Sequence, residues 1–151
     1  MSDPAFAFAR STRAPGRHVV LFDGECPFCT KNAARLEQFA RSGAIEKLSF
    51  HDEGVLARFP GITREACMRA MHFVTRDGHV HVGAAAIAQA LRTRPFIGAP
   101  ALIYYVPGIR SLADMLYDIV AENRYQLFGR SVGATCREGL CSLPRPVPPQ
   151  D

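Results

Sequence analysis

The sequence lacks long hydrophobic runs and blocks of like charge. Its best candidate for a membrane span, residues 96–109, is too short to cross a bilayer and contains Pro100 and Pro107, so we expect no membrane span. Lysine and arginine never occur in a run of five, and the net charge is only +4, which gives no indication of a nucleic-acid partner. Neither a glycine-rich phosphate loop nor a G-x-S-x-G elbow is present.

A secretory signal is not recognisable either, because Arg10 and Arg13 interrupt the short apolar stretch near the start. The chain has five cysteines, an odd number that leaves at least one thiol unpaired if the others form disulfides. We therefore expect a cytoplasmic, reduced protein whose cysteines serve chemistry and not a disulfide framework.

Length and composition are those of one globular domain. The 151 residues are 48% hydrophobic and 21% charged, which is ordinary for a soluble protein and sufficient for a hydrophobic core. We expect residues 1–17 to form a flexible leader, residues 18–143 a single domain with C-terminal helices from about residue 96, and residues 144–151 a proline-rich tail.

The rest of the chain is organised around residues 19–29, V-V-L-F-D-G-E-C-P-F-C. Four apolar residues suit a strand that is buried on both faces, and Asp23-Gly24 ends it with a turn. Pro27 fits the first position of a helix, where a backbone N–H would have no partner. The pattern therefore predicts a strand, a tight turn and a C-x-x-C pair at the start of a helix.

This placement favours thiolate chemistry. At a helix N-terminus the unsatisfied N–H groups and the helix dipole stabilise a thiolate, and such C-x-x-C cysteines have pKa values of roughly 3.5–7.5. Because the thiolate attacks disulfides, we predict Cys26 as the nucleophile and Cys29 as the resolving thiol. The exchange needs no metal or organic cofactor. Its partners would be a disulfide-containing protein or small molecule and a thiol electron donor.

A zinc site is the alternative from a different class of protein. A C-x-x-C pair can be half of a four-thiolate site, for which Cys136 and Cys141 would supply the second pair. The chain would then be a structural or interaction module that binds zinc through Cys26, Cys29, Cys136 and Cys141. Inert packing is the remaining interpretation of the first pair.

Strand and helix patterns alternate along the chain. We expect strands at 44–51, 71–76 and 79–82, with an Asp77-Gly78 hairpin turn between the last two. Short helices are expected at 53–60 and after Thr63, and a longer one at 84–92. This order predicts an α/β, thioredoxin-like fold, which is a mixed four-stranded sheet flanked by helices with a helical C-terminal extension. The C-x-x-C pair would lie at the carboxyl end of a strand, where open α/β sheets place their sites.

The extension contains an amphipathic segment at residues 109–123. Its apolar residues recur at helical spacing and are Ile109, Leu112, Leu116, Ile119 and Val120. We expect this helix to pack on the domain, since its acidic polar face argues against a role at an anionic membrane surface.

The histidines indicate no further site. His18 and His51 are expected near opposite ends of neighbouring strands, so they have no joint role. His79 and His81 would share one face of an edge strand, where contact with water is favoured over metal binding.

Residues 23–29, D-G-E-C-P-F-C, resemble the D-G-x-C-x-x-C signature of the DCC family of thiol-disulfide oxidoreductases. Two later segments also resemble that family, N-R-Y-Q-L-F-G at 123–129 and C-S-L-P at 141–144. The resemblance covers residues 18–146 and implies a thioredoxin-related fold and thiol-disulfide exchange. It marks Asp23, Cys26 and Cys29 as the site.

The resemblance leaves individual roles open. Asp23 would act either as a proton acceptor for Cys29 or as a structural cap, and the Asp-Gly turn signal slightly favours the cap. Arg124, Tyr125 and Cys141 are candidates to flank the site. C-P-F-C also resembles the glutaredoxin site, so a glutathione-dependent reductase is the alternative enzyme.

Two departures concern the substrate side and the tail. Thioredoxins and glutaredoxins have a cis-proline just before the strand that corresponds to residues 71–74, whereas this chain has Arg69-Ala70 there. Cys136 is not required by the closing motif, and we expect Cys136 and Cys141 to be plain tail thiols and not a relay.

Overall fold

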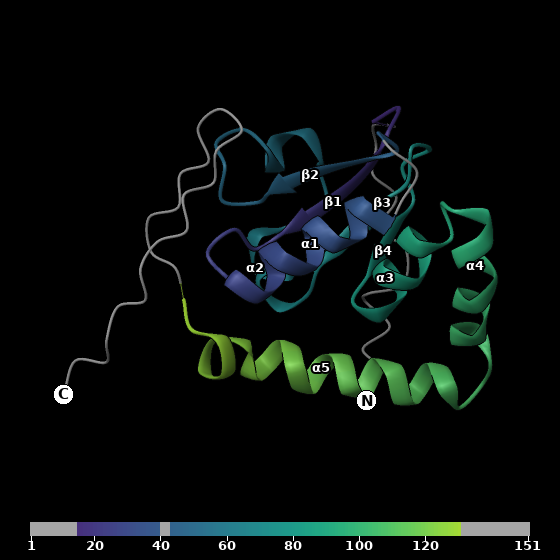
Figure 1. The fold of residues 1–151 in the computed structure, drawn as a ribbon. Coiled ribbons are helices and arrows are strands. Elements are labelled where there is room, and N and C mark those ends of the chain that lie inside the picture. Colours follow the sequence, from purple (N-terminus) through teal and green to yellow (C-terminus); the bar gives the residue numbers. More distant parts are fainter. Residues whose placement is uncertain (1–14, 40–42, 131–151) are drawn as a thin grey trace.

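Four strands form one mixed sheet at the centre of the fold (Figure 1). The structure is a computed structural model that describes residues 15–39 and 43–130. The strands are β1 (His18–Phe22), β2 (Ile45–Ser49), β3 (His72–Val74) and β4 (Val80–Val82). In the order β2-β1-β3-β4, β1 pairs in parallel with β2, and the other two pairings are antiparallel. This confirms the predicted α/β, thioredoxin-like arrangement.

Helices connect the strands in the predicted order. They are α1 (Pro27–Phe39), η2 (Leu56–Arg58), α2 (Arg64–Arg69) and α3 (Ala84–Leu91). Thr63 caps α2, because its hydroxyl accepts the N–H of Ala66 at 3.2 Å. The hairpin between β3 and β4 turns at Gly78, whose φ of 88° is one that glycine adopts readily.

β1 is buried because apolar clusters cover both faces of the sheet. Val19 and Leu21 belong to the cluster that contains Phe50, while Val20 belongs to the one that contains Phe73. The three β1 residues are 0% exposed, and burying each such side chain stabilises the fold by about 1.5–3 kcal/mol. The core thereby fixes the position of the residues that follow β1.

A helical extension completes the described chain. It consists of α4 (Pro95–Ala101), η3 (Leu102–Tyr105) and α5 (Ile109–Phe128). α5 contacts α1 and α3 and runs along the side of the domain that these helices form (Figure 1). Tyr117 anchors its middle, since the N–H of Met71 donates to the Tyr117 hydroxyl at 2.8 Å.

α5 leaves an apolar surface on its outer side. We define the α5 stripe as Ile109, Leu112, Met115, Leu116 and Ile119, whose side chains are 39–53% exposed. The predicted helix is therefore present and packs on the domain. Its most apolar face, however, points away from the domain. Tyr117 and Arg124 take inward positions instead, where their polar groups find hydrogen-bond partners.

Gly83 gives a test of how α5 is seated. We expect Gly83→Ala to destabilise the protein more than Gly108→Ala, as measured by urea unfolding. Both glycines have positive φ, 64° and 90°, so each substitution strains the backbone by roughly 1–3 kcal/mol. At Gly83 alone, the new Cβ would also lie 3.3 Å from the ring of Tyr117, whereas nothing lies within 4 Å at Gly108. Equal losses would contradict close packing of Tyr117 against β4 and α3.

Several predictions concern residues outside the described ranges. Cys136, Cys141, residues 144–151 and most of the leader at 1–17 are among them, and the predicted domain boundaries stay predictions. Within residues 15–39 and 43–130, no helix combines the length and the apolar character needed to cross a bilayer.

Candidate active site

The two cysteines of the C-x-x-C motif lie where β1 ends and α1 begins. Cys26 directly precedes α1, and Cys29 lies in its first turn. The backbone N–H of Cys29 donates to the Cys26 sulfur at 3.2 Å. Serine or aspartate makes the same contact when it caps a helix N-terminus. A thiolate at Cys26 therefore caps α1 and is in turn stabilised by the helix dipole.

The pKa values of the two thiols move in opposite directions. A hydrogen bond from the Cys29 thiol lowers the pKa of Cys26 from 9.0 to about 7. Burial of Cys26 acts in the opposite direction, and the N–H of Cys29 adds to the lowering. The same hydrogen bond, together with burial, raises the pKa of Cys29 above its ordinary value, because Cys29 holds the shared proton. When the pair loses one proton, the charge therefore lies on Cys26 and the remaining proton on Cys29.

Burial differs between the two cysteines. Cys26 is 0% exposed, whereas Cys29 keeps part of its surface accessible. Both are free thiols in this structure. Because the Cys26 sulfur has no exposed surface, a substrate disulfide can reach it only after neighbouring side chains move.

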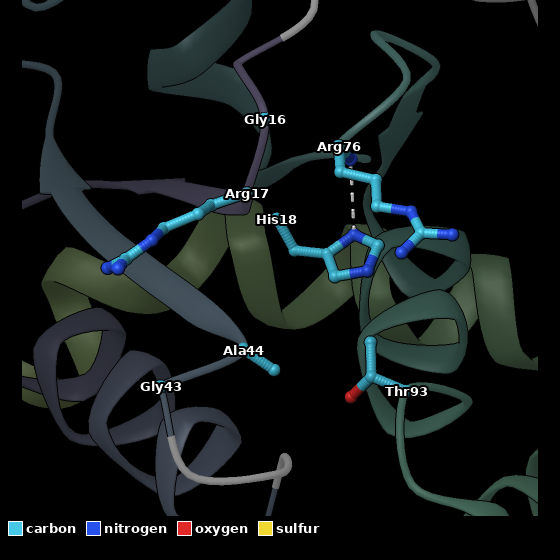
Figure 2. Close-up of a pocket in the computed structure, with 7 residues that line it drawn as sticks. All are labelled: Gly16, Arg17, His18, Gly43, Ala44, Arg76 and Thr93. Atoms are coloured by element: carbon cyan, nitrogen blue, oxygen red, sulfur yellow. Dashed lines mark hydrogen bonds between the residues drawn. The ribbon is translucent and has the colours of Figure 1, made fainter.

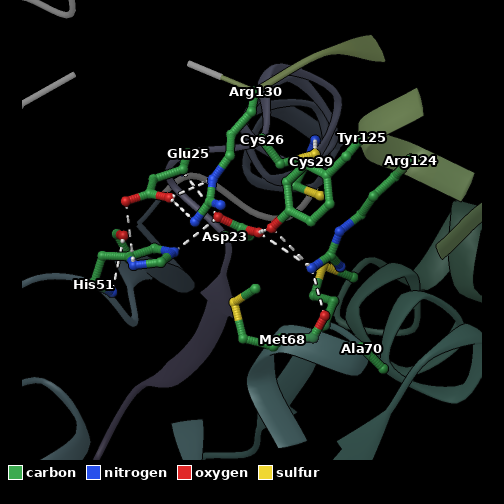
Figure 3. A network of polar contacts seen from close by, with 12 residues as sticks. Asp23, Glu25, Cys26, Cys29, His51, Met68, Ala70, Arg124, Tyr125 and Arg130 are labelled. Carbon is green, nitrogen blue, oxygen red and sulfur yellow. Dashed lines mark hydrogen bonds and ion pairs between the residues drawn. The ribbon is translucent and has the colours of Figure 1, made fainter. Parts of the chain in front are cut away.

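Asp23 is the centre of a polar network beside the cysteines (Figure 3). It is 2% exposed and follows β1 directly. Its Oδ1 accepts the N–H of Glu25 at 2.9 Å and contacts Nε2 of His51 at 2.9 Å. Its Oδ2 accepts hydrogen bonds from the Arg124 guanidinium at 3.1 Å and from the Tyr125 hydroxyl. Both carboxylate oxygens are thus occupied by donors.

Arg124 brings the C-terminal helix to this network. Its side chain is 5% exposed, and its Nη2 donates to the Met68 carbonyl as well as to Asp23. Its Nε has no hydrogen-bond partner among the residues that the structure describes. A buried charge of this kind is stabilised by its counter-ion, so Asp23 and Arg124 depend on each other.

His51 is a member of the network that the sequence did not single out. Arg64 contacts its Nδ1 at 2.8 Å, and a guanidinium can only donate, so Nδ1 accepts and Nε2 carries the proton given to Asp23. The signal that could have found it is topological. Phe22 pairs with Ser49 in the parallel register of β1 and β2, so the residues just after these strands are neighbours.

Aromatic and charged side chains form the rim of the site. Tyr125 lies between two guanidinium groups, 4.8 Å from Arg124 and 5.5 Å from Arg130, measured to its ring centroid. Burial and the hydrogen bond to Asp23 raise the pKa of Tyr125 to about 12. Arg130 also binds Glu25, through its Nε at 2.8 Å. These contacts hold the end of α5 against the turn that carries the cysteines.

The predicted site residues occupy one region of the structure. Asp23 lies in the turn that leads to Cys26 and Cys29, and Arg124 and Tyr125 reach it from α5. Ala70 and Met71 precede β3, and the Ala70 carbonyl accepts Nδ1–H of His72 at 2.9 Å. No peptide bond in the described ranges is cis.

The described residues include Cys26 and Cys29, the first half of the alternative zinc site. Among residues 15–39 and 43–130, no three His, Cys, Asp or Glu side chains are placed to hold a metal ion. Cys136 and Cys141, the second half of the alternative zinc site, lie outside these ranges.

A separate hollow lies at the other end of β1 (Figure 2). Its volume is about 330 Å³, and it is lined by Gly16, Arg17, His18, Gly43, Ala44, Arg76 and Thr93. It contains none of the predicted site residues. The cysteines, in contrast, lie at the carboxyl end of β1, where open α/β sheets carry their sites.

The sheet and the paired thiols at its carboxyl edge place the protein among thioredoxin-like dithiol proteins. Residues 20–130 match the family described as DCC1-like thiol-disulfide oxidoreductase, which is most of the chain. The chain belongs to this family, as its motifs predicted. The description of the family names thiol-disulfide oxidoreductase activity.

A curated relative extends the comparison to plants. It is a protein of Arabidopsis thaliana, named as uncharacterized and chloroplastic, and is 28% identical over 113 residues. The match covers 74% of this chain and 52% of the relative, so the chain spans about half the length of that protein. No solved structure matches the chain. The plastid location belongs to the relative, and the cytoplasmic location of this chain stays a prediction.

Proposed function

We propose that the protein exchanges disulfides through Cys26 as the attacking thiolate and Cys29 as the resolving thiol. One observation carries this proposal: the N–H of Cys29 donates to the Cys26 sulfur at 3.2 Å, at the start of α1. The side chain of Cys29 and this N–H together lower the pKa of Cys26 to about 7. About half of Cys26 is then ionised at neutral pH, against a few per cent of an ordinary thiol.

The reaction takes two exchange steps. The Cys26 thiolate attacks one sulfur of a substrate disulfide, forms a mixed disulfide and releases the first substrate thiolate, which takes a proton from water. Cys29 then loses its proton and attacks the Cys26 sulfur, which forms the Cys26–Cys29 disulfide and releases the second thiolate. Two electrons pass from the protein to the substrate. A thiol donor restores the dithiol by the reverse sequence.

Asp23 is assigned a positioning role in this proposal. Four donors occupy its two oxygens, and one of them, the N–H of Glu25, belongs to the turn itself. A carboxylate in this setting holds the turn and attracts the end of α5. To accept the proton of Cys29 it would first have to release one of these donors.

A stoichiometric assay tests the function directly. Pre-reduced protein is mixed with bis(2-hydroxyethyl) disulfide, and the released thiol and the cysteine pairing are followed by mass spectrometry. We expect two thiols released per protein and a new Cys26–Cys29 disulfide. Unchanged thiols, or release only after a zinc chelator is added, would overturn the proposal. If glutathione alone restores the Cys26–Cys29 dithiol, the protein is the glutaredoxin-like, glutathione-dependent reductase.

The pH dependence of alkylation tests the cause of the Cys26 reactivity. We expect the rate at Cys26 to rise with pH through a midpoint of about 7, because the thiol is protonated below this value and ionised above it. Cys29→Ala removes the donated hydrogen bond and should move the midpoint upward, towards 9.0. Cys29→Ser is the matched control, since its hydroxyl still donates. A midpoint that stays near 7 in Cys29→Ala would show that the Cys29 thiol is not the cause.

A further inference from the structure

α5 presents a long apolar surface without a partner among the described residues. The α5 stripe lies on the outer side of the helix, and its five side chains follow each other at helical spacing. Exposed apolar patches of this extent usually mark a binding surface for another molecule. The stripe covers the first half of a helix that is about 30 Å long, at 1.5 Å per residue.

The border of the stripe is acidic. Asp118 and Glu122 are exposed and follow Met115 and Ile119 at a spacing of three, so they lie beside the stripe. Residues 111–123 contain no lysine or arginine, although the whole chain has a net charge of +4. The surface is thus complementary to an apolar face that is bordered by positive charge.

The same helix leads to the thiols. At its far end, Leu127 and Phe128 are 63% and 45% exposed. The ring of Phe128 stacks on Phe28 with 4.2 Å between their centroids, and Phe28 stands between Cys26 and Cys29 in the sequence. Phe128 is nine residues after Ile119 and lies on the opposite side of α5 from the stripe. A molecule that covers the stripe therefore reaches the C-x-x-C motif by passing round the C-terminal end of α5.

We propose that the α5 stripe docks a basic amphipathic helix of the protein that exchanges disulfides with this chain. The inference rests on the proposed function and adds the kind of partner. The apolar face of the partner helix covers the stripe, and its lysine or arginine residues pair with Asp118 and Glu122. A segment that follows the partner helix passes round the C-terminal end of α5 and brings its disulfide or dithiol to the Cys26–Cys29 pair. Docking also supplies the contacts that can displace side chains from the buried Cys26 sulfur.

The acidic border distinguishes this partner from two others. A second copy that packed antiparallel about a two-fold axis would bring Asp118 and Glu122 beside the same border of its neighbour, which is unfavourable. An anionic lipid surface would be repelled by these carboxylates. A dimer through the stripe, or binding to phosphatidylserine vesicles, would each overturn the proposal, and both are measured by sedimentation.

Two synthetic peptides test the docking. Both form a helix with the same leucine face, and both carry a terminal cysteine in a disulfide with 2-mercaptoethanol. In the first peptide lysine residues border the leucine face, and in the second peptide glutamate residues border it. With pre-reduced protein at low salt, we expect the lysine peptide to react about tenfold faster, and the advantage to shrink as salt is added. Equal rates would refute the acidic docking surface.

A charge reversal provides the matched control. The variant Asp118→Lys/Glu122→Lys should react faster with the glutamate peptide than with the lysine peptide. The reaction of this variant with bis(2-hydroxyethyl) disulfide should equal that of the wild-type protein. Binding of the same peptides without cysteine, measured by fluorescence anisotropy, reports docking without chemistry. If the peptides bind but their disulfides do not react, the proposed function is refuted and the docking is not. If the peptides react at equal rates, the docking is refuted and the proposed function is not.

Discussion

Cys26→Ser is expected to lose all turnover of bis(2-hydroxyethyl) disulfide, whereas Cys29→Ser should carry out the first step and stop. The hydroxyl of serine is not ionised near neutral pH, so Cys26→Ser has no attacking group at the helix N-terminus. In Cys29→Ser the thiolate remains, and no second thiol resolves the product. Mass spectrometry should find one 2-mercaptoethanol bound at Cys26 in this variant and none at position 26 in Cys26→Ser.

The opposite pattern would reverse the assignment of the two thiols. Trapping at Cys29 in the Cys26→Ser variant would make Cys29 the nucleophile, in spite of its raised pKa. Cys67→Ser is a suitable control for the background thiols. It is 3% exposed, and burial raises its pKa to about 12, so its loss should not change the release of thiol.

Arg124→Met is expected to destabilise the fold by about 3–5 kcal/mol, because it leaves the buried carboxylate of Asp23 without its counter-ion. Methionine keeps much of the apolar length of the side chain, so the loss reports charge and hydrogen bonding more than volume. Urea unfolding followed by circular dichroism gives the free energy of unfolding. The contact of Tyr125 with Asp23 remains available in this variant.

A double-mutant cycle separates the ion pair from other effects. Asp23→Asn/Arg124→Met removes both charges, and it should unfold less readily than Arg124→Met, since no uncompensated carboxylate stays buried. If the double variant loses as much free energy of unfolding as the two single variants together, the two residues are not energetically coupled. A small loss in Arg124→Met alone would place Asp23 in contact with water, against its 2% exposure.

The sequence was sufficient where structure is decided locally. The apolar run at residues 19–22 predicted β1 because a strand covered on both faces needs no alternation. Asp77-Gly78 predicted the hairpin through a turn that favours glycine, and Thr63 predicted the start of α2 through its cap. The C-x-x-C motif at the start of α1 follows from the same kind of local signal.

The sequence was insufficient where contacts join distant segments. His51 acquires its place only through the register of β1 and β2, and no motif marks it. The family resemblance drew attention to Arg124 and Tyr125, but it did not reveal that both contact Asp23. For α5, the apolar periodicity predicted the helix but not the face that packs inward. Tyr117 and Arg124 lie on that face, and their hydrogen bonds are to Met71 and Asp23, residues distant in the sequence.

The reach of Arg124 has a consequence for biosynthesis. It meets Asp23 across 101 residues of chain, and contacts of such separation form late because a long loop must close first. As the chain leaves the ribosome, β1 and the cysteines emerge well before α5. The nascent protein therefore has both thiols before the helix that contributes Arg124 and Tyr125 to the site.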